Sequence, residues 1–316
     1  MDQASAQRRV LITGAGPIAS VGIGREDFWQ GIAEDRVGIA PSERLADTGP
    51  FPAVGECWDF AAEDFLTSKK TYLDRCSELV LCSCILALED AALEQGEIAP
   101  ERLGIGFGTA FGCLESMTNH SARVQAKGVR FGSPMIFTHT MANAPTAIAC
   151  IEYGIRGPAA TLCAGSASGA CALEFALRRL READADMMLA GGADALGSAL
   201  INALPADSDP PPGEGACMFL LERAEHAYAR GARVIGELVS VHVAGLGGAN
   251  TGADTGANTG EAPPYGHTFG ARVPLELCAL LGTGDDGQRV TVSVCSDAGG
   301  VTGPAATAVA ECGDSR

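Results

Sequence analysis

Apolar and polar residues follow one another in blocks whose lengths predict an α/β fold. Short apolar runs typical of buried strands occur at 9–13, 102–110, 157–164, 185–195, 217–222 and 234–245. Apolar residues recur at helical spacing over 25–36, 73–96, 143–155 and 168–183. Strands and helices that alternate in this way predict layers around a largely buried sheet. The sequence GAGP at 14–17 is expected to end the first strand in a turn.

The pattern changes after residue 244. Residues 245–266 are rich in Gly, Ala, Thr and Asn and poor in apolar side chains, which predicts a flexible linker. Only a helix at 271–282 and strands at 289–296 and 305–311 are expected beyond it. That is too little for an independent domain, so we expect this tail to dock onto the preceding part.

Charge and composition narrow the functional classes. With 39 acidic and 22 basic residues the net charge is −17, which disfavours nucleic-acid binding because phosphate contacts need clustered Lys and Arg. No apolar run reaches about 18 residues and no apolar signal region precedes the first strand, so we expect a cytoplasmic protein without a membrane span. Several of the 12 cysteines lie in apolar segments, which favours buried reduced thiols. No metal-ligand spacing stands out.

The stretch CAGSASG, residues 163–169, carries the candidate chemistry. It joins an apolar strand to a predicted helix, and such a turn presents a side chain at the helix N-terminus, here Ser166. A serine hydroxyl is a weak acid and needs a positioned general base to act as a nucleophile. Ser166 is therefore either a working nucleophile or a remnant on a retained turn.

Several long blocks resemble the β-ketoacyl-acyl-carrier-protein synthases. These blocks are residues 9–41, 73–93, 133–195 and 213–239, and the resemblance returns at GHTFGA (266–271) and VSVCSDAGG (292–300). The resemblance implies a thiolase-like layered α/β fold (αβαβα). It also implies a complete N-terminal half at 8–244, a linker at 245–266 and a strongly shortened C-terminal half at 267–312. No cofactor is implied.

The residues that differ from the family pattern bear on the reaction. Ser166 stands where the family has its acyl-accepting cysteine, and His267 matches the second family histidine. The block that carries the first histidine is missing, and Ala262 stands at the family lysine. A helix N-terminus can lower the pKa of a thiol enough to give thiolate, but it cannot do so for a hydroxyl. Both Ser166 and His267 are therefore expected to be vestigial.

One subfamily fits a ketosynthase body that has lost its nucleophile: the chain-length factor, or ketosynthase β subunit, of type II polyketide synthases. The resemblance implies a non-condensing subunit that pairs with an active ketosynthase and meets acyl carrier protein through that partner. It implies that Phe111, Leu114 and Met117 line the acyl tunnel. Two alternatives stay open: a serine-dependent acyltransferase or hydrolase using Ser166 and His267, and an inactive scaffold that binds carrier protein.

Overall fold

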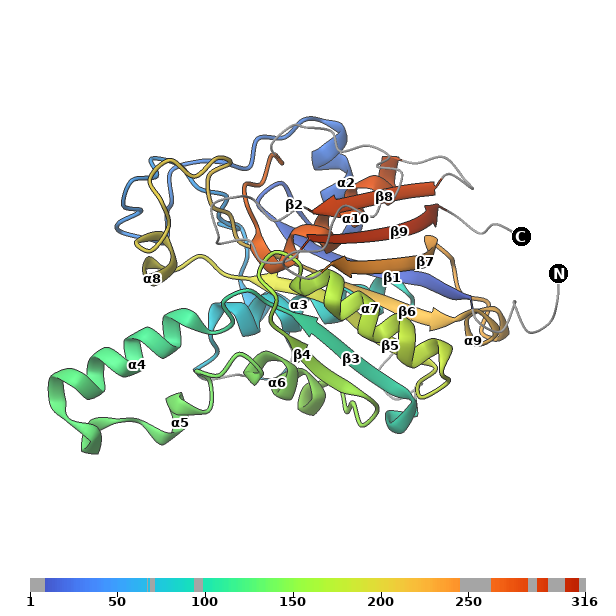
Figure 1. The fold of residues 1–316 in the computed structure, drawn as a ribbon, viewed down its shortest axis with the longest axis horizontal. Coiled ribbons are helices and arrows are strands. Elements are labelled where there is room, and N and C mark those ends of the chain that lie inside the picture. Colours follow the sequence, from blue (N-terminus) through green and yellow to red (C-terminus); the bar gives the residue numbers. More distant parts are fainter. Residues whose placement is uncertain are drawn as a thin grey trace.

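The computed structural model describes residues 9–66, 68, 72–93, 99–244, 263–283, 289–294 and 305–312. The described strands form one mixed sheet in the order β4-β3-β5-β6-β1-β7-β9-β8, with β2 paired to β1 (Figure 1). The strands are β1 (Val10–Ala19), β2 (Gly22–Ile23), β3 (Leu103–Gly108), β4 (Ala159–Leu162), β5 (Met187–Asp194), β6 (Gly215–Arg223), β7 (Gly236–Ala244), β8 (Arg289–Val294) and β9 (Ala305–Cys312). The α-helices are α2 (Arg25–Ala33), α3 (Arg75–Asp90), α4 (Leu114–Lys127), α5 (Pro134–Phe137), α6 (Ala144–Glu152), α7 (Ser168–Arg181), α8 (Ser198–Ile201), α9 (Ala224–Ala229) and α10 (Arg272–Thr283). Short 3-10 helices are η1 (Ala62–Asp64), η2 (Pro100–Arg102), η3 (Val129–Phe131) and η4 (Phe269–Ala271).

Helices cover both faces of this sheet, as the alternating pattern predicts. Strands β4, β3 and β5 are parallel, as expected where helices connect them, and the remaining pairings are antiparallel. Helices α3 and α6 pack on one face, whereas α7 packs on β3 and β5 and also contacts β7 and β9. Helix α10 likewise contacts both β6 and the β8–β9 pair. The α/β prediction is confirmed.

The alternation of side chains along β6 shows how the sheet builds two cores. Cys217 and Phe219 join a cluster with α7 and α10, while Met218 and Leu220 join the cluster that contains α3. Successive side chains on a strand point to opposite faces, so a continuous apolar run is needed where both faces are covered. This requirement explains why the central strands have almost no polar positions.

Strand β1 is longer than the sequence analysis predicts. It runs through GAGP to Ala19 and pairs with β6, with one irregularity between Ile12 and Gly14, so the predicted turn at 14–17 is wrong. The glycines have another role there. A Cβ at Gly14 would lie 2.1 Å from the carbonyl oxygen of Ala87, and one at Gly16 would lie 2.0 Å from that of Ser83. The glycines therefore let α3 cross the strand at close range.

The tail joins the sheet of the preceding part. Strand β9 pairs antiparallel with β7, and β8 pairs with β9. Tyr265, just before α10, is buried with its ring centroid 6.0 Å from that of Phe28. Most of the predicted linker, residues 245–262, lies outside the described residues. The boundaries 8–244, 245–266 and 267–312 stay a prediction.

Candidate functional site

The turn before α7 is built as a sharp elbow at the end of β4. Gly165 has φ +57°, a left-handed conformation that glycine adopts without strain. The Ser168 hydroxyl accepts a hydrogen bond from the Ala164 N–H at 2.8 Å and lies 2.6 Å from the Gly165 carbonyl oxygen. It also lies 2.9 Å from the carbonyl oxygen of Thr109, which ties the elbow to the end of β3. The strand, turn and helix predicted around Ser166 are present.

Ser166 lies at the elbow with its side chain closed off from solvent. Its exposed fraction is 1%, and within the described residues its Oγ has no hydrogen-bond partner. No described base is therefore placed to take its proton, as serine nucleophiles require. Cys163, three residues earlier, is exposed as a residue, but its thiol loses part of its hydration in the fold. This desolvation raises the pKa of the Cys163 thiol and disfavours the reactive thiolate.

The segment of His267 lies directly over the first turn of α7. A Cβ at Gly169 would lie 2.5 Å from the carbonyl oxygen of Gly270, so these two backbones are in close contact. His267 Nδ1 accepts a hydrogen bond from the Phe269 N–H at 3.1 Å, and the two rings are 4.5 Å apart. The backbone N–H of His267 donates to the carbonyl oxygen of Pro211 at 2.8 Å. The structure thus brings the His267 segment to the elbow, without a hydrogen bond between the Ser166 and His267 side chains.

Phe111 and Leu114 lie at the root of α4, beside the His267 segment. The ring of Phe111 meets that of Phe269 edge-on, with centroids 5.0 Å apart at 80°. Both Phe111 and Leu114 pack against the apolar cluster that includes Phe269 and Leu200. Met117, one turn further, is 43% exposed. The three predicted tunnel residues are therefore divided between a packed root and an exposed helix face.

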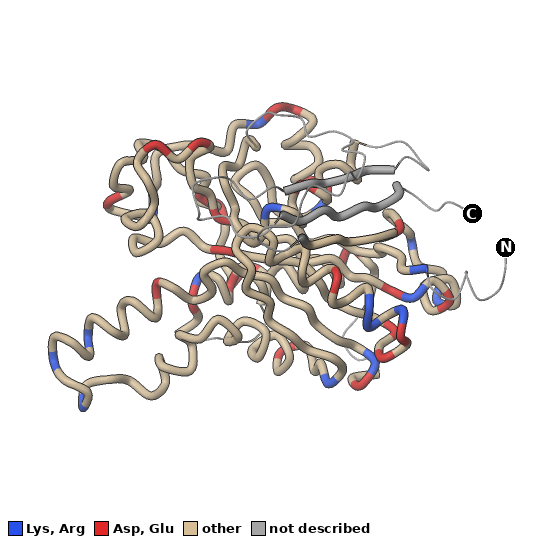
Figure 2. The backbone as a smooth tube through the Cα atoms, in the orientation of Figure 1, with Lys and Arg blue, Asp and Glu red and all other residues tan. Residues whose placement is uncertain are grey.

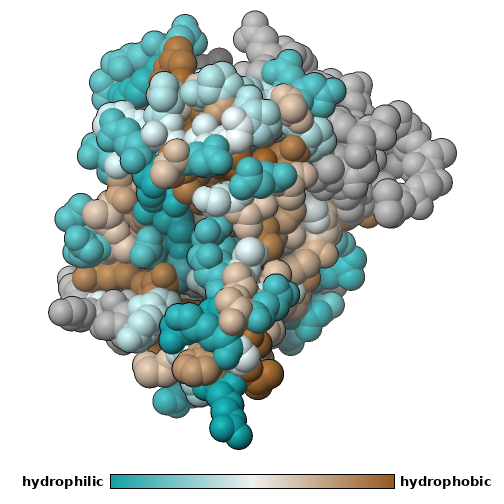
Figure 3. All heavy atoms as spheres, turned by 90° about the vertical axis from the view of Figure 1, so that its left-hand side faces the viewer, coloured by the Kyte–Doolittle hydropathy of each residue, from teal (hydrophilic) through white to brown (hydrophobic). Residues whose placement is uncertain are grey.

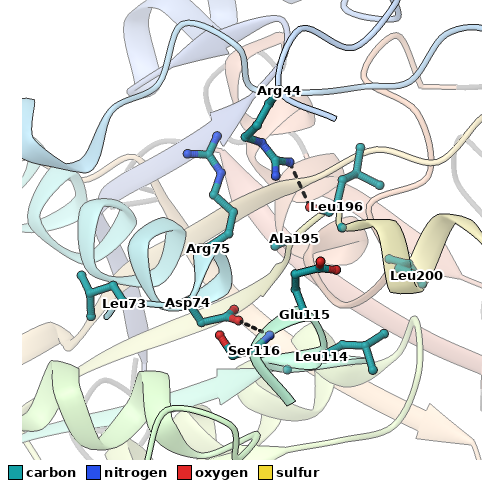
Figure 4. A pocket seen from close by; sticks show the side chains of 12 residues that line it. Arg44, Leu73, Asp74, Arg75, Leu114, Glu115, Ser116, Ala195, Leu196 and Leu200 are labelled. Carbon is teal, nitrogen blue, oxygen red and sulfur yellow. Dashed lines mark hydrogen bonds between the residues drawn. The ribbon is translucent and has the colours of Figure 1, made fainter. Parts of the chain in front are cut away.

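A pocket of about 170 Å³ lies behind the first turn of α4 (Figure 4). Leu114 and Leu200 lie on one side of it, Leu73 and Asp74 lie on the opposite side, and Arg44 lies between these sides at the top of the view. Leu114 thus stands between the apolar cluster at the root of α4 and a space that is already hollow.

Two arginines that line this pocket, Arg44 and Arg75, belong to a charge network behind it. Glu214 is fully buried, and its carboxylate accepts hydrogen bonds from Arg75 at 2.9 Å and from Arg44 at 3.2 Å. Arg44 also donates to the carbonyl oxygen of Leu196 at 2.9 Å. Paired buried charges of this kind are costly to break, because the remaining partner is left uncompensated. The network holds the side chains of Arg44 and Arg75 in place at the pocket.

An arm formed by α4, η3 and α5 (residues 114–137) projects from the body (Figure 1). None of its helical residues is buried. Five of the eleven exposed large apolar side chains in the described part of the chain lie on it: Met117, Val129, Phe131, Met135 and Phe137. Figure 3 faces this end and shows apolar side chains among polar ones, and Figure 2 shows basic positions along the outer part of the arm. Apolar side chains gathered on one exposed segment mark an interaction surface.

Two residues of the site escape the sequence analysis: Asp194 and Phe269. Asp194 ends β5, is fully buried, and accepts hydrogen bonds from the N–H groups of Phe111 and Gly270 at 2.9 and 2.8 Å. Burial raises the pKa of Asp194, and its hydrogen bonds oppose that rise. The available signal was an acidic residue at the end of an otherwise apolar strand. Phe269 carried none, since its role depends on contact with Phe111.

Other chemistry can be assessed for the described residues. Among them no group of three or more His, Cys, Asp or Glu side chains is arranged to hold a metal ion. No helix in that part of the chain is long and apolar enough to cross a membrane. The ten cysteines whose side chains the structure describes are free, and burial raises the pKa of Cys82 to about 12.

Comparison with known proteins identifies the family. The profile of the β-ketoacyl synthase N-terminal domain matches residues 7–204, which is more than half of the chain. The chain belongs to the β-ketoacyl synthase family. It is 31% identical to the 3-oxoacyl-[acyl-carrier-protein] synthase 2 of Synechocystis sp. over 74% of this chain and 62% of that protein. It is 29% identical to the granaticin polyketide putative β-ketoacyl synthase 1 of Streptomyces violaceoruber, over 73% of this chain and 62% of that protein.

Solved structures agree on the fold. The ishigamide ketosynthase/chain length factor superposes with a TM-score of 0.82 at 20% identity, over 98% of this chain and 100% of the matched chain. A β-ketoacyl synthase from Burkholderia phymatum gives 0.78 at 18% identity, over 97% of this chain and 100% of that one. The thiolase-like ketosynthase fold is thereby confirmed. This β-ketoacyl synthase homologue spans 62–64% of the length of the first curated relatives it matches.

Proposed function

We propose that this chain is a non-condensing, ketosynthase-like subunit, a chain-length factor, which pairs with an active β-ketoacyl synthase and shapes its acyl tunnel. The observation that carries the proposal is the elbow. It keeps the strand, turn and helix of a nucleophile site but presents Ser166, whose Oγ is buried and has no hydrogen-bond partner among the described residues. Condensation needs an acyl-thioester nucleophile and acid–base groups around it.

The exposed arm is evidence in favour of a partner subunit. Its five large apolar side chains, defined above, are exposed in the isolated chain. Strand β4 ends the strand order, so one of its edges is open within the described part of the sheet. Helix α6, which follows the arm, contacts β4 through a 2.6 Å hydrogen bond between the hydroxyls of Thr146 and Thr161. An exposed arm with large apolar side chains and an open strand edge both fit a subunit interface.

The named relatives are compatible with this assignment. The name of the ishigamide ketosynthase/chain length factor gives two components, a ketosynthase and a chain length factor. The whole length of one of its chains matches this chain. Another neighbour is a type II polyketide acyl-carrier protein in complex with its ketosynthase, at a TM-score of 0.75. We therefore propose acyl carrier protein as a partner that is met through the active ketosynthase.

A serine-dependent acyltransferase is the rival that an experiment must exclude. It would use Ser166 with His267 as base, and no hydrogen bond joins the two side chains among the described residues. The isolated chain, incubated with an acyl thioester, should remain unmodified by intact-mass spectrometry. Acylation of Ser166 in a one-to-one ratio would establish the rival and overturn the proposal.

Product length from a reconstituted complex tests the proposal directly. The partner is a ketosynthase with an intact cysteine and two histidines. Overfilling a packed space costs about 1–3 kcal/mol, so Leu114→Trp should shorten the products, and Leu114→Ala, which enlarges the adjoining pocket, should lengthen them. Val37→Trp, at a 77% exposed position, is the matched control and should change nothing. Unchanged lengths at normal yield for both Leu114 variants would refute chain-length control by this segment.

A further inference from the structure

Four hydrogen bonds converge on the carboxylate of Asp194 at the end of β5. Oδ1 accepts from the Thr109 hydroxyl at 2.6 Å and from the Phe111 N–H at 2.9 Å. Oδ2 accepts from the N–H groups of Ala110 and Gly270, both at 2.8 Å. The side chain is fully buried, and no described cation pairs with it. One carboxylate thus holds segments that lie about 160 residues apart in the sequence.

Both segments carry an aromatic ring next to the anchored backbone. Phe111 itself donates one of the four hydrogen bonds, and Phe269 precedes Gly270. The turn after Phe111 is fixed as well, because the Gly112 N–H donates to the Thr109 hydroxyl at 2.8 Å. Phe269 has φ +47°, a conformation that a bulky residue adopts only when its surroundings enforce it. The edge-on contact between Phe111 and Phe269 therefore depends on a backbone geometry that Asp194 holds.

We infer that Asp194 is a positioning residue that holds Phe111 against Phe269 and thereby helps to set where the growing acyl chain stops. The inference rests on the proposed function for its consequence, but its geometric part stands on the contacts alone. Asp194 itself does not contact the acyl chain, and it acts through Phe111. A carboxylate suits this role because it has only acceptor positions, and all four donors point at it.

Asp194→Asn is the decisive variant. Asparagine keeps the shape but replaces one acceptor oxygen by an NH₂ group, which then faces N–H donors. Glu222→Gln is the matched control. Glu222 is another fully buried carboxylate, and Arg230 donates a hydrogen bond to it. In the β5–β6 pairing, Glu222 lies opposite Met187 at one end, and Asp194 lies opposite Gly215 at the other end. Eight strand residues separate the two ends by about 23 Å.

The first readout needs no partner subunit. 4-Fluorophenylalanine placed at position 111 of the full chain should give a single ¹⁹F resonance that the neighbouring Phe269 ring shifts. Asp194→Asn should move or split that resonance, and Glu222→Gln should leave it in place. If Asp194→Asn fails to fold, Thr109→Val removes one of the four donors and should have the same effect in weaker form. A resonance that neither Asp194→Asn nor Thr109→Val disturbs would overturn the inference.

The second readout is the product-length profile of the reconstituted complex. Asp194→Asn should change the ratio of neighbouring chain lengths by about fivefold or more, equivalent to ~1 kcal/mol. Phe111→Ala should change it too, and adding Asp194→Asn to Phe111→Ala should add little. If Phe111→Ala changes the lengths and Asp194→Asn does not, the positioning role is wrong while the proposed function stands. If Phe111→Ala and both Leu114 variants leave the product lengths of an active complex unchanged, the proposed function is wrong. The ¹⁹F result alone then decides whether Asp194 positions Phe111.

Discussion

Replacing Ser166 by alanine should stabilise the protein and leave the activity of the complex unchanged. The Ser166 hydroxyl is 1% exposed and has no hydrogen-bond partner among the described residues. An unsatisfied buried hydroxyl costs roughly 1–3 kcal/mol, so its removal should raise the free energy of unfolding by about 1 kcal/mol. For a chain of this size that corresponds to about 1.5 °C in Tm.

Ser168→Ala, two residues away, is the matched control with the opposite sign. The Ser168 hydroxyl accepts from the Ala164 N–H and lies within hydrogen-bond distance of the Gly165 and Thr109 carbonyl oxygens. Removing it leaves buried partners unpaired, which should lower stability by about 1–3 kcal/mol. The same amino-acid change is thus expected to stabilise at one position of the elbow and destabilise at the other.

The assay has two parts: urea unfolding of each variant and turnover of each reconstituted complex. Loss of stability in Ser166→Ala comparable to that in Ser168→Ala would mean that the Ser166 hydroxyl is bonded, and the reasoning from its burial would be wrong. A hundredfold fall in turnover with the heterodimer intact, equivalent to ~2.7 kcal/mol, would make Ser166 a participant in the reaction.

Two further predictions concern the surface and the acid stability of the fold. Phe137→Asp, on the arm, should weaken association with the active ketosynthase at least about tenfold, or ~1.4 kcal/mol, in light-scattering titrations. Val37→Asp, at an exposed position outside the arm, should leave the affinity unchanged. Equal affinities for the two variants would exclude the arm as the interface. The two hydrogen bonds from Arg102 lower the pKa of Asp186 below its unfolded value, so its contribution to stability is complete above about pH 5 and is lost as the pH falls through the folded pKa. Asp186→Asn should therefore lower the urea midpoint more at about pH 7 than near pH 3, and an equal loss at both values would contradict this linkage.

The local pattern of the chain was sufficient for the central strands, for the longer helices that cover them and for the elbow, but it did not predict α4, α5, α8 or α9. Apolar periods of two and of 3.6 residues report the environment of each segment, and these identified the strands and helices of the central layers. The residues CAGSASG placed Ser166 at a strand-to-helix turn for the same local reason, because small residues permit that turn. The long apolar runs also indicated that both faces of the sheet are covered.

The limits of the pattern appear where distant segments meet. GAGP is a turn signal by composition, yet Gly14 and Gly16 continue β1 because α3 packs against them. Phe111 and Leu114 were found by resemblance, but their packing against Phe269 and Leu200 depends on segments far along the chain.

By itself, then, the sequence determined most of the central strands and helices and the residue that occupies the elbow, since these depend on neighbours along the chain. Only the tertiary structure decided that the Ser166 hydroxyl is buried without a hydrogen-bond partner among the described residues, and that Asp194 anchors both Phe111 and Gly270. Burial and hydrogen bonding at these sites come from groups that the fold brings together over more than 70 residues of intervening chain, and no local periodicity encodes that proximity.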